Sequence, residues 1–206
     1  MSGYEARCNM KSVDALVKKA MDYKKKGLKE DEIADELHLS KDTVVWLLTR
    51  NIKGGEPPKD VKIGWRSIGV MGNRIAAMAS AMTDIVLEET EKSGNEPQCV
   101  AGIAINGIPY ATCISEELGS ELAIYRPPSE RGKGGGHFSS NYASIQNKKV
   151  IFVDDVLSTG ETMKGAIKDL RANNGTPILA VVVVNKTGND ELDGVPLRAL
   201  IRARSI

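Results

Sequence analysis

The stretch Val150-Ile-Phe-Val-Asp-Asp-Val-Leu-Ser-Thr-Gly-Glu-Thr162 decides the fold of this chain of 206 residues. It opens with an apolar run, residues 150–153, of the kind that forms a buried parallel strand. Asp154 and Asp155 follow, and then a turn, Ser158-Thr159-Gly160, before a helical pattern that Thr162 opens. The sequence therefore predicts a strand that ends in two carboxylates and turns over into a helix N-terminus.

This order of residue types favours a ribose phosphate as ligand. A helix N-terminus offers unpaired N–H donors and a positive dipole end, which suit a phosphate group. The carboxylates of Asp154 and Asp155 can accept hydrogen bonds from sugar hydroxyls. The alternative is an ordinary strand, turn and helix whose turn is merely polar.

The segment resembles the phosphoribosyl-pyrophosphate (PRPP) motif of type I phosphoribosyltransferases. It lacks the Gly-Lys-Ser/Thr of a P-loop and the three spaced glycines of a dinucleotide fingerprint. The resemblance implies that the two acids hold the ribose hydroxyls. It also implies that the 5-phosphate is held by Ser158, Thr159, Gly160 and Thr162. Mg²⁺ bound together with PRPP would bridge its hydroxyls and pyrophosphate, because this ion prefers phosphate oxygens and retained waters; no side chain is assigned as a metal ligand.

The composition limits the classes of protein to which this chain can belong. Lysine plus arginine number 28 and aspartate plus glutamate 27, so any nucleic-acid surface must be local. The three cysteines, Cys8, Cys99 and Cys113, lack metal-ligand spacing and fit a reducing intracellular compartment. The longest apolar run, residues 178–184, is far shorter than the roughly 20 residues that span a bilayer. We therefore expect a cytoplasmic protein without a membrane partner.

Residues 67–206 are predicted to form an α/β domain with a doubly wound, mostly parallel sheet, because strand and helix patterns alternate. The expected strands are residues 99–105, 121–125, 150–153, 178–185 and 197–202, and the expected helices are residues 68–90, 109–118 and 162–171. Ligands of such sheets bind beyond the carboxyl ends of the strands.

A second turn, Ile105-Asn106-Gly107-Ile108-Pro109, falls at the same edge of the predicted sheet. Gly107 permits close backbone approach to an anion, although any strand-to-helix turn can carry Gly and Pro. The turn resembles the pyrophosphate loop of orotate phosphoribosyltransferases. That resemblance places Asn106 and Gly107 beside the pyrophosphate.

The long loop of residues 126–147 departs from the orotate phosphoribosyltransferase pattern. In those enzymes the loop closes over the site and brings a lysine to the leaving pyrophosphate. Here Arg126 is kept as a ligand-binding residue, Pro127 and Glu130 stand where two lysines belong, and Gly132 takes the place of a histidine. Lys133 is left as a candidate for a shifted catalytic role. Since catalysis needs charge that strengthens binding in the transition state, we expect retained ligand binding without enzyme activity, as in a ligand sensor.

Residues 1–52 are predicted to form a small helical domain that resembles a helix-turn-helix. One short helix carries Ile33, Ala34 and Leu37, a turn follows at His38-Leu39, and Ser40 caps a second helix. The resemblance places six residues in the major groove of DNA: Ser40, Lys41, Asp42, Thr43, Trp46 and Arg50. The alternative is a three-helix interaction or dimerisation module. Residues 53–66, rich in Gly and Pro, are predicted to be a linker.

The whole chain resembles the archaeal orotate-phosphoribosyltransferase-like regulators of the GfcR family, in which a helix-turn-helix precedes a phosphoribosyltransferase-like domain. The resemblance implies a regulator of sugar or central carbon metabolism genes that binds double-stranded DNA as a homodimer. PRPP or a related ribose phosphate would be its effector. The alternative is an active phosphoribosyltransferase, acting on orotate or another base, with a helical appendage.

Overall fold

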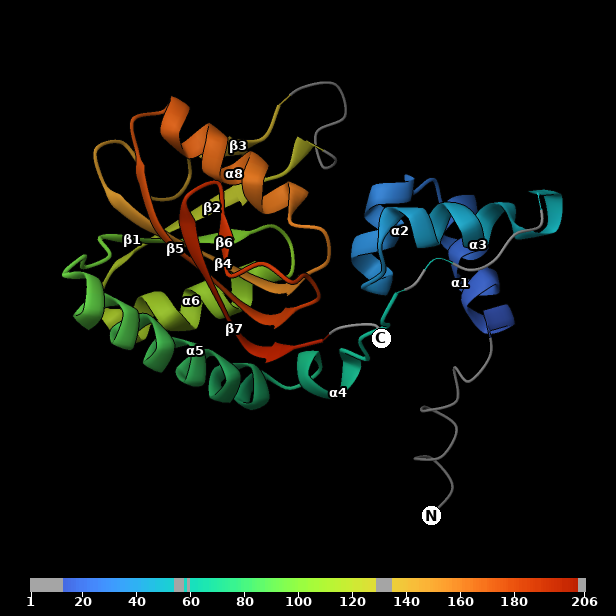
Figure 1. The fold of residues 1–206 in the computed structure, drawn as a ribbon, viewed down its shortest axis with the longest axis horizontal. Helices are drawn as coiled ribbons and strands as arrows, with labels where there is room; N and C mark the ends of the chain where they lie inside the picture. The colour runs from blue at the N-terminus through green and yellow to red at the C-terminus, as the bar shows by residue number, and fades with distance from the viewer. Residues whose placement is uncertain (1–12, 54–57, 59, 129–134, 204–206) are drawn as a thin grey trace, which may run out of the picture. The chain divides into compact units, whose positions relative to one another are not determined.

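The computed structural model describes residues 13–53, 58, 60–128 and 135–203. The chain divides into two compact units between Ile63 and Gly64, within the range 53–66 that was predicted as a linker (Figure 1). That range is not irregular throughout, because one helix ends at Lys53 and another begins at Arg66. Each unit has a hydrophobic core of its own.

Three helices form the described part of the N-terminal unit: α1 (Val13–Lys25), α2 (Glu30–Leu37) and α3 (Lys41–Lys53). Apolar residues three and four positions apart give each helix one face toward a shared core. That core contains Ala20, Ile33, Ala34, Leu37, Leu39, Val44 and Leu47. His38 ends α2 in the left-handed conformation, with φ 51°, and only residues 38–40 separate α2 from α3. The predicted helices of this unit are confirmed.

The C-terminal unit is built on a seven-stranded sheet in the order β3-β2-β1-β4-β5-β7-β6. Five strands run parallel: β1 (Cys99–Ile103), β2 (Glu121–Arg126), β4 (Lys149–Leu157), β5 (Thr176–Asn185) and β7 (Val195–Arg202). The short strands β3 (His137–Phe138) and β6 (Glu191–Leu192) add to the two edges in the antiparallel sense. The predicted mostly parallel sheet is confirmed, and the two edge strands were missed because two residues show no periodicity.

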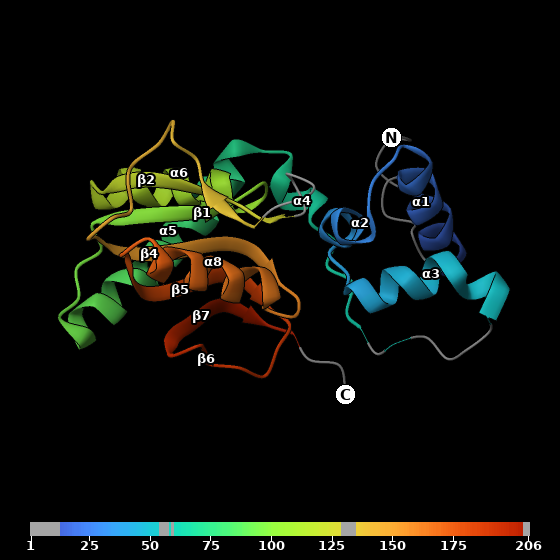
Figure 2. The same cartoon turned by 90° about the horizontal axis from the view of Figure 1, so that it is seen from above.

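Helices cover both faces of this sheet. α8 (Glu161–Ala172) lies on one face, and α5 (Gly72–Ser93) and α6 (Gly107–Leu118) lie on the other, as Figures 1 and 2 show. The α8 face buries Phe152, Met163 and Ile167, among other side chains. Among the described residues no helix is both long and apolar enough to cross a membrane.

The helix predicted over residues 68–90 is in fact two helices. α4 (Arg66–Gly69) ends before Val70, and Met71 is extended, with φ −132° and ψ 116°, before α5 begins. The break falls between Gly69 and Gly72, and glycine is a poor helix former. Leu87, an apolar residue of α5, is 53% exposed. It lies between the buried Val86 and the exposed Glu88, so the core-facing stripe of α5 is narrower than expected.

Candidate functional site

The two adjacent carboxylates lie inside strand β4 rather than beyond its end, which corrects the predicted strand of residues 150–153. β4 continues to Leu157 because Asp154 and Val156 keep pairing with Val182 and Val184 of β5. Since successive side chains of a strand point to opposite faces, the two acids differ in exposure. Asp155 is 3% exposed, whereas Asp154 is half-buried. Only Asp154 therefore presents its carboxylate to solvent in this structure.

Burial sets the protonation chemistry of Asp155. It raises the pKa of this carboxyl from 3.8 to about 6, although the backbone N–H of Val156, which donates to Asp155 Oδ1 at 2.6 Å, favours the ionised form. Burial and then the nearby charge of Asp155 raise the pKa of the Tyr110 hydroxyl to about 12. Because a hydrogen bond from a donor favours the ionised form of a carboxyl, hydroxyl donors brought by a ligand would stabilise the charged form of Asp155.

The turn after β4 leads into α8 without a side-chain cap. Gly160 is the N-cap residue, and its φ of 85° requires the left-handed conformation that glycine favours. Ser158 is half-buried, while Thr159 and Thr162 are exposed. The turn thus offers hydroxyls together with the first N–H groups of the 12-residue helix α8, an arrangement that suits an anion.

Gly107 brings the second predicted turn against the acids. A Cβ atom at this position would lie 2.3 Å from the Val153 carbonyl oxygen and 3.1 Å from the Cα of Asp154. Only glycine lets the first turn of α6 come so close to β4. Asn106, the N-cap residue of α6, is half-buried and makes no side-chain capping hydrogen bond. The N-termini of α6 and α8 therefore begin at the carboxyl ends of adjacent parallel strands.

Arg126 is exposed at the end of β2, where it pairs with His137 of β3. Because β2 is the parallel neighbour of β1, Arg126 belongs to the same edge of the sheet as Asn106. Pro127 follows as a buried residue. The predictions for Glu130, Gly132 and Lys133 lie outside the described residues.

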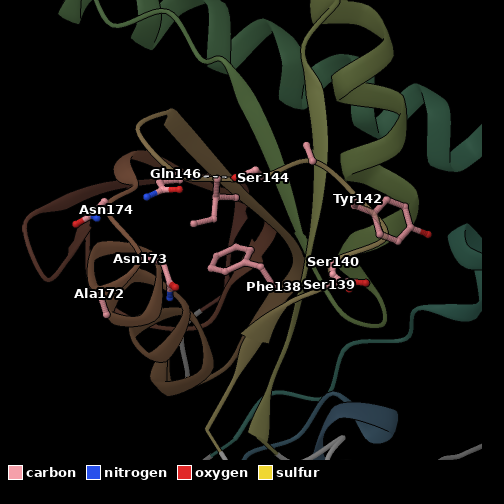
Figure 3. Close-up of a pocket in the computed structure, with 11 residues that line it drawn as sticks. Phe138, Ser139, Ser140, Tyr142, Ser144, Gln146, Ala172, Asn173 and Asn174 are labelled. Carbon is pink, nitrogen blue, oxygen red and sulfur yellow. Dashed lines mark hydrogen bonds between the residues drawn. The ribbon is translucent and has the colours of Figure 1, made fainter.

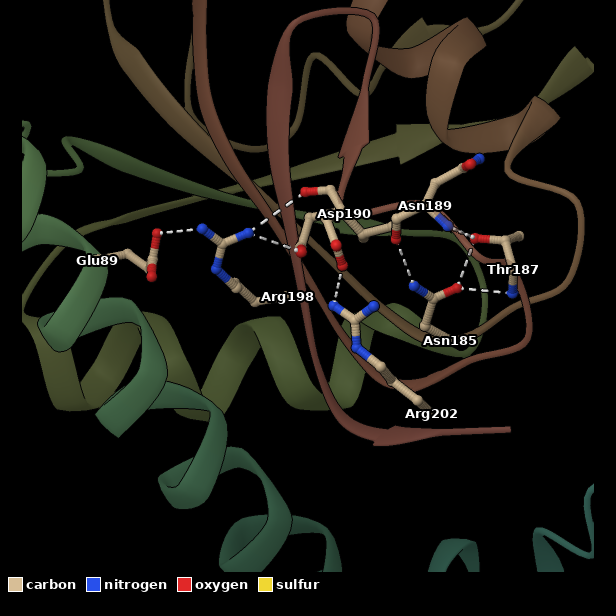
Figure 4. A network of polar contacts seen from close by, with 8 residues as sticks. Glu89, Asn185, Thr187, Asn189, Asp190, Arg198 and Arg202 are labelled. Atoms are coloured by element: carbon tan, nitrogen blue, oxygen red, sulfur yellow. Dashed lines mark hydrogen bonds and ion pairs between the residues drawn. The ribbon is translucent and has the colours of Figure 1, made fainter. Parts of the chain in front are cut away.

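The loop after β5 belongs to this edge but was missed by sequence reasoning. The Lys186 N–H donates to the Leu157 carbonyl at 2.9 Å, which ties the loop to the end of β4. Asn185 is fully buried; its Nδ2 donates to the Asn189 carbonyl, and its Oδ1 accepts from Thr187 N–H and Oγ1–H (Figure 4). The polar run 185–189 directly after an apolar strand was the available signal.

Ion pairs continue this network beyond the loop. Arg198 Nη2 donates to Glu89 Oε2 of α5 at 2.8 Å, and Arg198 Nη1 donates to the Asp190 carbonyl at 3.3 Å (Figure 4). Arg202 pairs with the Asp190 side chain. The loop is thus fixed to α5 and β7, and it can hold Lys186 in place beside β4.

A pocket of about 510 Å³ lies away from the predicted ligand residues. Its lining residues precede β4 and β5, so it belongs to the amino ends of these parallel strands. Figure 3 shows Phe138 among the lining side chains, with Asn173 beside it. The lining side chains carry no charge, so this pocket offers nothing to balance a phosphate. Among the described residues, no group of three or more His, Cys, Asp or Glu side chains is placed to hold a metal ion.

In the N-terminal unit, the predicted DNA-contacting residues differ in exposure. Lys41 and Asp42 are exposed at the start of α3, and Ser40 is half-buried. Trp46 is half-buried and packs against the helical core. Arg50 lies in α3, but its side chain is outside the described part of the structure. Val45, which is 40% exposed, was not singled out from the sequence.

Thr43 is turned inward, contrary to the prediction that it faces a groove. It is 8% exposed, and its Oγ1 donates to Asp60 Oδ2 at 2.9 Å. The Ser40 N–H donates to the same carboxylate oxygen at 2.7 Å. Asp60 therefore joins the segment after α3 to the first turn of α3, and Ser40 and Thr43 support that helix end. Sequence reasoning missed Asp60 because it lies 20 positions from Ser40.

Lys41 forms an ion pair with the neighbouring helix α2. Its Nζ lies 2.9 Å from Asp31 Oδ1 of α2, and the hydrogen bond with Asp31 raises the pKa of Lys41. Both side chains are about half exposed, so the pair is screened by solvent and costs little to open. Lys41 can exchange Asp31 for another anion.

The chain is similar to known proteins over most of its length. Residues 71–196 match the model of the phosphoribosyl transferase domain family. A protein of Thermoplasma acidophilum called transcriptional regulator GfcR is 48% identical over 197 residues, which are 96% of this chain and 98% of that protein. The transcriptional regulator GfcR of Archaeoglobus fulgidus is 40% identical, over 94% of this chain and 98% of its own.

Solved structures share the fold of the C-terminal unit. Orotate phosphoribosyltransferase from Aeropyrum pernix superposes with a TM-score of 0.55 and 24% identity, covering 73% of this chain and 83% of that one. The Mycobacterium tuberculosis orotate phosphoribosyltransferase, solved in complex with PRPP, gives a TM-score of 0.54 at 16% identity and covers 68% and 80% of the two chains. At these identities the likeness supports the fold alone.

Proposed function

Because the chain belongs to the GfcR family of transcriptional regulators and carries a phosphoribosyl transferase domain, we propose that it couples DNA binding to a ribose phosphate signal. In this proposal the N-terminal unit binds double-stranded DNA, and the C-terminal unit binds PRPP or a related ribose phosphate as effector. The observation that supports an effector site is the close approach of Gly107 to Val153 and Asp154, which places the start of α6 against β4 where its acids lie.

The proposed ligand spans the carboxyl edge of the sheet. Asp154 and Asp155 accept hydrogen bonds from the ribose hydroxyls, and the 5-phosphate binds the N-terminus of α8 through Ser158, Thr159, Gly160 and Thr162. Asn106 and Gly107 lie by the pyrophosphate, toward which Arg126 supplies positive charge. Mg²⁺ bound together with PRPP would neutralise part of the ligand's phosphate charge, and the half-buried carboxylate of Asp154 would suit a magnesium-bound water.

The proposed DNA contacts centre on the exposed start of α3. Lys41 and Arg50 supply phosphate or guanine contacts, and Asp42 and Val45 are exposed for base edges, Val45 toward a thymine methyl. Ser40 and Thr43 act at the helix end that they stabilise, and Trp46 supports the helix from the core side. A homodimer would place two such helices on a palindromic site.

A pull-down of sheared genomic DNA by the purified protein, with and without PRPP and Mg²⁺, tests both halves of the proposal. We expect enrichment of a palindromic motif near sugar or central carbon metabolism genes, and a change in recovery when PRPP is present. Equal recovery of all fragments in both conditions would reduce the N-terminal unit to an interaction module.

The alternative, an active phosphoribosyltransferase, rests on the same acids and phosphate turn. A steady-state assay with PRPP, Mg²⁺ and orotate separates the two functions. We expect no turnover above background, because Pro127 and Glu130 replace two lysines of the orotate phosphoribosyltransferase pattern. Robust turnover that Asp155→Asn abolishes would favour the enzyme.

Replacing both Lys41 and Arg50 with Ala should weaken DNA binding and flatten its salt dependence. Each phosphate contact contributes about 0.9 to the slope of log K against log salt concentration, so losing two lowers the slope by about 2. Fluorescence anisotropy at several salt concentrations measures it. Lys18→Ala with Lys25→Ala, which removes two exposed charges from α1, is the matched control. An equal loss of slope in the control would show that α3 has no special part in binding.

A further inference from the structure

Two anchors lie at the ends of a short stretch of chain, residues 60–65, which we call the coupling segment. At its first residue, Asp60 receives hydrogen bonds from Ser40 N–H and Thr43 Oγ1–H at 2.7 and 2.9 Å. Its other carboxylate oxygen accepts the N–H of Val61 at 2.7 Å. A carboxylate at a helix N-terminus also complements the helix dipole. Asp60 therefore positions the first turn of α3, the part of this helix proposed to meet DNA.

The next residues of the coupling segment are partly buried. Burial, and then the charge of Lys19 on α1, lower the pKa of Lys62. Val61 and Ile63 are half-buried. The segment is thus hydrogen-bonded at Asp60 and partly buried up to Ile63, where the N-terminal unit ends.

At its last residue, the coupling segment is anchored in the C-terminal unit. The Trp65 ring packs edge-on against Tyr110, with ring centroids 6.1 Å apart and planes at 67°. Gly69 leaves room for this ring, since a Cβ there would lie 3.3 Å from Trp65 Cδ1. Tyr110 is 1% exposed and lies one helical turn after Gly107, whose backbone lies against Val153 and Asp154 of β4. Trp65 therefore packs on the helix turn that borders the proposed ligand.

We propose that residues 60–65 transmit the ligand signal, with Asp60 positioning the DNA-reading helix and Trp65 sensing the ligand-bordering turn of α6. Only Val61, Lys62, Ile63 and Gly64 separate the two anchors. A shift of Trp65 is therefore passed along a few residues to Asp60 and the first turn of α3. A ligand changes DNA affinity only if it binds two such arrangements unequally. The inference rests on the proposed function, which supplies both binding events.

Inserting Gly-Ser-Gly between Ile63 and Gly64 tests the proposal, because it leaves both anchors intact and makes their connection flexible. Three quantities are measured: the PRPP affinity with Mg²⁺, the affinity for an enriched DNA fragment, and the change in that DNA affinity caused by PRPP. The matched control carries the same insertion between Gly94 and Asn95, in the turn between α5 and β1.

In the unaltered chain and in the control, we expect PRPP to change the DNA affinity by about 5- to 150-fold, the usual range of allosteric coupling. In the 63/64 insertion variant, both separate affinities should stay within about twofold while the PRPP effect disappears, since coupling and binding are separate free energies. A PRPP effect of full size in this variant overturns the inference. A failure of the unaltered chain to bind PRPP or DNA counts against the proposed function instead.

Single substitutions at the two anchors give independent readouts. Trp65→Ala should remove the PRPP effect on DNA affinity, and Trp65→Phe, which keeps an aromatic ring, should restore it. Asp60→Ala should reduce the preference for the enriched fragment over random DNA while binding to random DNA persists, because phosphate contacts remain. Asp22→Ala, an exposed carboxylate of α1, controls for the change in charge. Loss of both kinds of DNA binding in Asp60→Ala would indicate a merely structural role and would overturn the assignment of Asp60.

Discussion

Gly107→Ala is expected to abolish PRPP binding and to destabilise the C-terminal unit. The added Cβ would lie 2.3 Å from the Val153 carbonyl oxygen, which is backbone in the middle of β4 and cannot rotate away. The start of α6 must then move off the strand, and it takes Asn106 and the helix N-terminus with it. Overpacking of this kind costs about 1 to 3 kcal/mol, or a fall in Tm of about 3 to 10 °C.

Gly72→Ala is the matched control for this substitution. Gly72 is the first residue of α5 as Gly107 is of α6, but a Cβ at Gly72 meets nothing within 4 Å. Alanine at a helix position without a clash is neutral or stabilises by up to about 1 kcal/mol. Calorimetric titration with PRPP and Mg²⁺ and a thermal melt compare the two variants. PRPP affinity that survives Gly107→Ala would remove the start of α6 from the ligand site.

The sheet and most helices could be predicted because the strands carry continuous apolar runs and the helices carry apolar residues at helical spacing. The apolar runs before Asp154 and before Asn185 became β4 and β5, and the alternation of strands with helices predicted their parallel pairing. The two-residue strands β3 and β6 carry no such pattern, and they form only because a longer neighbour is present to pair with.

The parts of the candidate sites that depend on distant contacts could not be read from local sequence. Thr43 has the residue type and spacing of a base-contacting position, yet a carboxylate 17 positions away turns it inward. Likewise, the difference between Asp154 and Asp155 comes from β4 continuing as a strand, which sends adjacent side chains to opposite faces. Both outcomes follow from tertiary pairing, which overrides the local pattern.

Asp155→Asn is expected to weaken ligand binding and yet to raise the stability of the free protein at neutral pH. Burial raises the pKa of Asp155 from 3.8 to about 6 in the folded chain. The folded state therefore holds this proton more tightly than the unfolded state does, and its stability falls as the pH rises from about 4 through 6. Above that range the ionised carboxylate costs the folded state roughly 3 kcal/mol, at about 1.4 kcal/mol for each pKa unit.

Asparagine keeps an acceptor for the Val156 N–H but cannot ionise. The Tm of the variant should therefore exceed that of the unaltered protein by about 5 to 10 °C at pH 7.5, while the two should nearly agree at about pH 3, below the pKa of Asp155 in both states. PRPP affinity at pH 7.5 should fall about 10- to 100-fold, because a hydrogen bond to a charged acceptor is lost.

Asp154→Asn separates the effect of a β4 carboxylate on PRPP binding from its effect on the stability of the folded chain. Asp154 is half-buried, so its replacement should lower PRPP affinity without a comparable gain in Tm. If Asp155→Asn gave the same Tm gain at about pH 3 as at pH 7.5, the stabilisation would come from packing and not from a buried charge. If the Tm gain of Asp155→Asn is confined to neutral pH and PRPP binding is weaker, the chain retains a destabilising carboxylate where its effector binds. This is expected when a site keeps a buried charge for its ligand.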